Sequence, residues 1–76
     1  MLRKGFVVEV QNDSIVVRVT GTSYAVTYHK PTDTPQLLVK NFPVRDDHRA
    51  PMRVAEFLAG AWQLANDKAR ELNWIV

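Results

Sequence analysis

The apolar residues change their spacing once along this chain. From Phe6 to Tyr28 they fall at alternate positions, whereas from Val54 to Leu72 they recur about every 3.6 residues. Alternation is typical of strands with one buried face, and the longer period is typical of an amphipathic helix. The sequence therefore predicts an α+β fold, in which an antiparallel meander of three strands precedes one long C-terminal helix packed on one face of the sheet.

Two short turns divide the alternating region into strands at residues 5–11, 14–20 and 23–29. Asn12 and Asp13 both tolerate positive φ, which predicts a two-residue type I′ turn between the first two strands. Gly21 and Thr22 provide the second turn. These bounds fix the register of both hairpins.

The two turns select the same inward face of the sheet. The first places Val8 opposite Val17, and the second places Val17 opposite Val26, whereas a slip of one residue would reverse the faces. The opposite face is mixed, and there Glu9 and Arg18 lie near enough to pair. The residues predicted to face inward are Phe6, Val8, Val10, Ile15, Val17, Val19, Tyr24, Val26 and Tyr28.

A loop with two prolines, residues 30–35, follows the third strand. Residues 36–41 could add a fourth strand at the sheet edge, which Pro43 would end because it has no N–H for a ladder. The sequence leaves open whether this strand forms. We therefore expect three strands, or four in the order βββ(β)α.

The helix is predicted over residues 51–72, with Pro51 in its first turn, where a missing N–H is tolerated. Asn73 suits the left-handed residue after the helix, and Trp74 would fold back on the last turn. Gly60 and Gln63 are expected on the solvent side of this helix. The predicted core comprises Phe6, Val8, Val10, Val17, Val19, Val26, Val54, Phe57, Leu58, Ala61 and Ala65.

The apolar side of this helix is wider than a single sheet requires. A helix of that length spans about 33 Å, against about 23 Å for a seven-residue strand. In one interpretation Trp62 covers the edge of the core and the tail folds over the sheet. In the other, these residues bind a partner, most simply a second copy, since closed dimers are common and Trp is enriched at interfaces. The candidate interface residues are Trp62, Leu64, Trp74, Ile75 and Val76.

The size of the chain predicts a single domain over residues 1–76. Its 46% hydrophobic and 24% charged residues are typical of a soluble globular protein, and no apolar run is long enough for a membrane span. The absence of cysteine fits a cytoplasmic protein and excludes disulfides. Without a metal-ligand motif either, self-association as a homodimer is the remaining way to stabilise so small a core.

The densest group of reactive side chains is the segment from Arg45 to Arg49. His48 next to Asp47 could form an acid–base pair. The simpler interpretation is a solvated loop whose aspartates lie near the positive end of the helix. No glycine-rich phosphate loop, metal-ligand spacing or nucleophile motif accompanies it. We therefore expect neither catalytic activity nor a bound cofactor.

Nucleic-acid binding is the alternative function. The formal charge of +2 is mild, and the open sheet face is expected to lack the aromatic residues on which bases stack. The element order is similar to that of the small sheet-plus-helix domains of some bacterial antitoxins, a likeness of fold that would imply a regulatory module. The primary prediction is a self-associating protein-interaction module without catalytic activity. The candidate polar or nucleic-acid contacts are Arg18, His29, Arg45, His48, Arg49 and Arg53.

Overall fold

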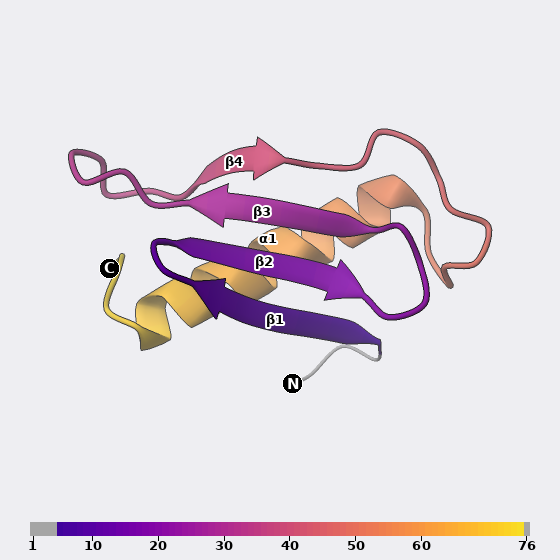
Figure 1. The fold of residues 1–76 in the computed structure, drawn as a ribbon, viewed down its shortest axis with the longest axis horizontal. Helices are drawn as coiled ribbons and strands as arrows, with labels where there is room; N and C mark the ends of the chain where they lie inside the picture. Colours follow the sequence, from indigo (N-terminus) through magenta and orange to yellow (C-terminus); the bar gives the residue numbers. More distant parts are fainter. Residues whose placement is uncertain (1–4, 76) are drawn as a thin grey trace.

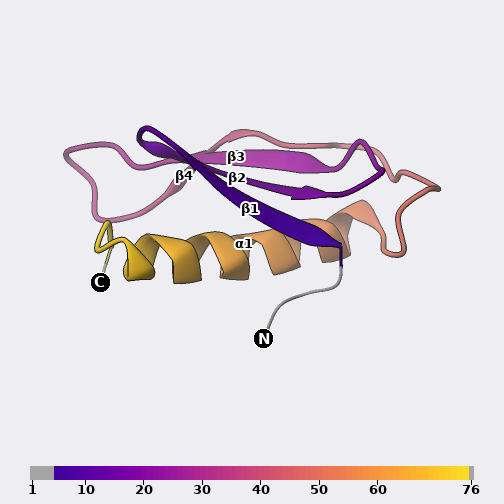
Figure 2. The same ribbon diagram turned by 60° about the horizontal axis from the view of Figure 1, so that its bottom comes forward.

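A computed structural model describes residues 5–75 as a four-stranded antiparallel sheet with one helix on one of its faces (Figures 1 and 2). The strands follow one another in the sheet in the order β1-β2-β3-β4. This is the predicted α+β fold with the fourth strand present. The elements are β1 (Phe6–Gln11), β2 (Ser14–Val19), β3 (Ala25–His29), β4 (Leu38–Asn41) and α1 (Val54–Glu71).

Both predicted hairpin registers are confirmed. Val17 of β2 lies opposite Val8 of β1 on one side and opposite Val26 of β3 on the other. The first turn is not of type I′, because Asn12 takes a positive φ of 53° while Asp13 does not. The carbonyl of Asp13 instead accepts a hydrogen bond from the N–H of Lys30, at the end of β3.

The fourth strand is shorter than the segment that the sequence offered for it. Val39 lies opposite Tyr28, and Asn41 lies opposite Thr27, so β4 carries one extra residue at Lys40. Such a bulge kinks the strand locally and interrupts its pairing. Leu37, just before β4, is buried in the core, whereas all four residues of β4 are exposed.

The predicted start of the helix is wrong by three residues. Arg53 has an extended backbone and acts as the N-cap, so Pro51 lies outside α1. Two carboxylates hold this start: Asp46 Oδ1 accepts the N–H of Val54 at 2.8 Å, and Glu56 Oε1 accepts the N–H of Arg53 at 3.3 Å. The start of α1 is therefore set partly by Asp46, which lies eight residues before Val54.

The predicted end of the helix is confirmed. Asn73 takes a φ of 61°, its N–H donates to the carbonyl of Arg70, and the N–H of Trp74 donates to the carbonyl of Ala69. These two bonds form a Schellman motif, which satisfies carbonyls that the helix leaves unpaired.

The core lies between α1 and the faces of β1, β2 and β3. Alanines on the buried side of α1 let the helix approach closely enough for Phe57 to stack on Phe6 and Tyr24, at ring centroid distances of 5.7 and 4.9 Å. The buried hydrophobic residues are Ile15, Val17, Val19, Tyr24, Val26, Tyr28, Leu37, Phe57, Ala61, Ala65 and Ala69.

Two core predictions are wrong. Val10, predicted to be buried, is 43% exposed, because the twist of the sheet carries this end of β1 away from α1 (Figure 2). Gly60, predicted on the solvent side, is buried at the margin of the apolar stripe. The other predicted core residues are buried or pack partly buried against the core, as Phe6, Val8 and Leu58 do.

The helix covers only part of the sheet. α1 packs on β1, β2 and β3, whereas its backbone does not come close to that of β4 (Figure 1). The edge strand β4 is therefore left without a covering layer on the helix side.

Candidate functional site

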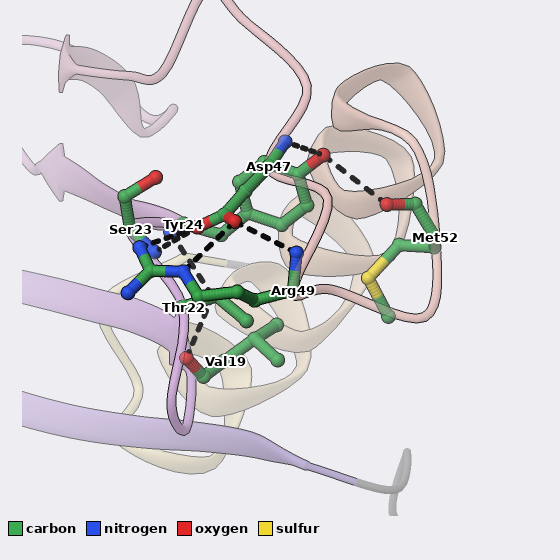
Figure 3. A network of polar contacts seen from close by, with 7 residues as sticks. All are labelled: Val19, Thr22, Ser23, Tyr24, Asp47, Arg49 and Met52. Carbon is green, nitrogen blue, oxygen red and sulfur yellow. Dashed lines mark hydrogen bonds and ion pairs between the residues drawn. The ribbon is translucent and has the colours of Figure 1, made fainter.

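Two features of the described residues are candidates for a function: a polar network around Asp47 and an exposed apolar edge at β4. Asp47 lies in the connection from β4 to α1, and its residue is only 8% exposed (Figure 3). Its Oδ2 accepts the N–H of Ser23 at 2.6 Å and Arg49 Nη2 at 2.9 Å. Its Oδ1 accepts the N–H and the Nε of Arg49, at 2.9 and 3.1 Å.

The Tyr24 hydroxyl extends this network into the core. It accepts the N–H of Asp47 at 3.0 Å and donates to the carbonyl of Met52 at 3.1 Å (Figure 3). The Tyr24 side chain, in the connection between β2 and β3, thus binds two residues of the segment that leads into α1, Asp47 and Met52. Residues 42–53 are tied to the sheet by hydrogen bonds that reach across more than twenty positions of sequence.

The charges of the network stabilise each other. The Arg49 guanidinium, with the N–H groups of Ser23 and Arg49, holds the pKa of the Asp47 carboxyl well below its usual range. The hydrogen bond to Asp47 and the charge of Asp47 in turn raise the pKa of Arg49. Asp47 is therefore held as a carboxylate whose oxygens are occupied by hydrogen bonds within the chain.

The segment from Arg45 to Arg49 is thus ordered by contacts, and the prediction of a solvated loop is wrong for Asp47. The prediction for Asp46 is confirmed, since it lies at the N-terminus of α1. His48 is exposed and is not among the partners that occupy the Asp47 carboxylate. The two-residue spacing of Asp47 and Arg49 could have predicted part of this network, because an aspartate commonly accepts the N–H two residues later in an Asx turn.

The basic residues predicted as nucleic-acid contacts do not gather into one patch. Three of these side chains are paired with carboxylates: Arg18 Nε with Glu9 Oε1 at 2.7 Å, His29 Nδ1 with Asp13 Oδ2 at 3.3 Å, and Arg49 with Asp47. His29 and the loop that carries His48 lie at opposite ends of β3. Arg45, His48 and Arg53 are exposed near the start of α1, beside Asp46 and Glu56. The acidic neighbours weaken the attraction that this region would have for phosphates.

The apolar edge consists of four residues in and after β4, which we call the β4 ribbon: Leu38, Val39, Phe42 and Val44. Val39 lies on the helix side of the sheet, because its partner Tyr28 faces the core, and it is 51% exposed. Leu38 lies opposite His29 on the other side of the sheet, so the strand carries apolar side chains on both faces. The backbone of α1 does not come close to β4, and each of these four side chains is about half exposed or more.

Trp62 borders the β4 ribbon on the helix side. Its ring packs on that of Tyr28 with a centroid distance of 5.5 Å and an interplanar angle of 59°. The Trp62 residue remains 45% exposed, while burial raises the pKa of Tyr28 to about 12. Tyr28 thus lies next to both Val39, its partner in β4, and Trp62, so the exposed part of the Trp62 ring lies on the same side of the sheet as Val39.

The other residues predicted at a partner interface pack differently. Leu64, Trp74 and Ile75 are partly buried against the core. Trp74 also lines a shallow pocket with the turn at Asn12 and Asp13 and with residues 30–32. The tail therefore folds back over the end of the sheet, as one of the two interpretations expected. Val76 lies outside the described residues.

Comparison with models of protein families, with curated proteins and with solved structures gives no match to this chain. Within residues 5–75, no helix has the length and apolar character needed to cross a membrane. The same residues contain no group of three His, Cys, Asp or Glu side chains placed to hold a metal ion. The function of the candidate site must therefore be inferred from the positions and contacts of its own residues.

Proposed function

We propose that this chain is a small, non-catalytic interaction module that associates with a second copy of itself. The observation that carries the proposal is the β4 ribbon, which presents apolar side chains on both faces of an unpaired sheet edge. Natural sheets commonly protect an edge with a covering element or with charge. Within residues 5–75 no helix covers β4, and the protection that this edge has is its short length, the bulge at Lys40 and the charge of that lysine, which leave Leu38, Val39 and Phe42 exposed.

The polar features of the molecule support a binding role over catalysis. The buried carboxylate of Asp47 is engaged by backbone and guanidinium donors, so its oxygens are committed to holding the chain together. The pocket around Asp46, His48 and Glu56 is shallow and open. A catalytic site usually needs a concave, largely enclosed pocket.

The test is the mass of the protein in solution as a function of concentration. We expect sedimentation velocity to show a rise from monomer toward dimer between about 10 μM and about 1 mM, the range in which weak interfaces become populated. Because the contact surface is apolar, raising the salt concentration should leave the dimer intact. A monomer mass over the whole range would refute self-association.

A further inference from the structure

The geometry points to one way in which two copies would join, and it rests on the proposed self-association. We infer that β4 pairs with β4 of a second copy in antiparallel orientation, with Val39 opposite the Val39 of that copy. The result would be one continuous eight-stranded sheet.

The free edge of β4 is four residues long and bulged at Lys40, so the pairing that we infer is short and centred on the regular part of the strand, at Leu38 and Val39. β4 pairs with β3 on one side only, so backbone groups on its other side have no partner strand within residues 5–75. Antiparallel pairing of two identical strands is self-complementary, as a two-fold contact requires. The backbone therefore specifies an extended partner, and a second β4 satisfies that requirement.

The position of the helix makes a second copy a better occupant than a lone peptide. A two-fold axis perpendicular to the joined sheet leaves both helices on the same face. This symmetry also brings the exposed flank of each α1, with Trp62, toward the two Val39 residues on the helix side of the joined sheet. A peptide strand alone would cover the edge of β4 but would bring no second helix to the exposed Trp62 ring.

The register follows from charge and from the two prolines on either side of β4, Pro35 and Pro43. Residues directly opposite each other in a sheet share a face. The two-fold axis must therefore lie between one residue of β4 and the same residue of the second copy. An axis at Lys40 would place two lysines opposite each other, which is destabilising. An axis at Asn41 would bring Pro43 into the paired segment, and an axis at Leu38 would bring in Pro35, neither of which can donate to a ladder. An axis at Val39 places Val39 against its counterpart and keeps the paired segment between the two prolines.

The available area fits a reversible dimer. Phe42 and Trp62 are 53% and 45% exposed, and since an aromatic side chain buries about 150–250 Å², they offer on the order of 200 Å² together. The aliphatic residues of the β4 ribbon add roughly as much. Two copies would then bury at most about 800 Å² of apolar surface besides the strand edges, less than the roughly 1,200 Å² at which stable specific interfaces begin, so the dimer should be weak and reversible.

Engineered cysteines test the pairing directly, because the full chain has no cysteine of its own. Directly opposite residues of antiparallel strands have Cα atoms about 4.5–5.5 Å apart, within the range of about 4.4–6.8 Å that a disulfide needs. Val39→Cys should therefore form a covalent dimer under mild oxidation. Val10→Cys is the matched control, since Val10 is a half-exposed valine on the helix side of the other edge strand, β1.

We expect Val39→Cys to cross-link at least about tenfold faster than Val10→Cys at equal concentration. We also expect Val39→Lys to remain monomeric at concentrations where the natural chain and Val10→Lys are dimeric, with circular dichroism showing that each is folded. If the natural chain dimerises but Val10→Cys cross-links as fast as Val39→Cys, the β4 pairing is wrong and self-association stands. If the natural chain never dimerises, both proposals fail.

Discussion

The two edges of this sheet are built from similar residues but are stabilised differently. On the β1 side, Phe6 stacks on Phe57 of the helix, and Val8 packs against the core. On the β4 side, the backbone of the helix does not come close, and the segment after the strand is held by hydrogen bonds that join its Asp47 and Met52 to Ser23 and Tyr24. Apolar burial therefore secures one edge, while a polar network secures the chain beyond the other.

The difference shows how a single helix divides a four-stranded sheet into a covered and an uncovered part. α1 has 18 residues and contacts three strands, and a fourth strand added beyond them receives no cover. The polar network compensates for the missing packing by fixing the connection from β4 to α1. The apolar side chains of β4 remain available for another surface.

The largest expected effect is on the covered side. Phe57→Ala removes the ring that joins Phe6 and Tyr24 and should destabilise the fold by about 3–5 kcal/mol, close to the whole stability of so small a domain. Trp62→Ala, on the uncovered side, should cost about 1–2 kcal/mol, because nearly half of Trp62 is already exposed. Urea denaturation followed by circular dichroism measures both, and equal losses would contradict the contrast.

The polar side should show its own pH dependence. Asp47→Asn should lower the free energy of unfolding at pH 7, by less than Phe57→Ala does, because the amide cannot accept hydrogen bonds at both of its terminal atoms. The fold lowers the pKa of Asp47, so the stability that the carboxylate contributes is present above its ordinary pKa of about 4 and is lost as pH falls below that value.

The gap in stability between the natural chain and Asp47→Asn should therefore be widest near neutral pH and should narrow progressively below about pH 4. Denaturant titrations at several pH values measure it. Asp33→Asn, in the exposed loop before β4, is the matched change of net charge and should alter stability little at pH 7. A gap for Asp47→Asn that stays constant down to pH 2 would contradict the role assigned to this carboxylate.

The smallest effects are expected at the two exposed valines. With the thiols kept reduced, Val10→Cys and Val39→Cys should each change the monomer's stability by less than about 1 kcal/mol, because each position is already half exposed. Thermal unfolding at low protein concentration measures this. Similar stabilities would show that any difference in cross-linking reports on pairing, whereas a large loss in one variant would show that the two edges are not comparable.

The candidate site was only partly predictable. The sequence predicted an exposed flank at Trp62, and the ion pair between Glu9 and Arg18 followed from the strand register. It offered residues 36–41 only as a possible edge strand and did not predict that the β4 ribbon would be an exposed apolar surface. The burial of Asp47 could not, because its partners Ser23 and Tyr24 lie more than twenty residues away. Charged side chains close together in sequence suggested a solvated loop, and distant backbone donors decided otherwise.

The sequence by itself determined the local features of this protein. The two-residue period, the turns and the left-handed Asn73 specify the hairpin registers and the end of the helix, because each depends on residues close together in the chain. Only the tertiary structure decided where α1 begins, which strands it covers and why Val10 is exposed while Leu37 is buried. Those outcomes depend on sheet twist, helix placement and contacts between distant residues, which no local pattern encodes.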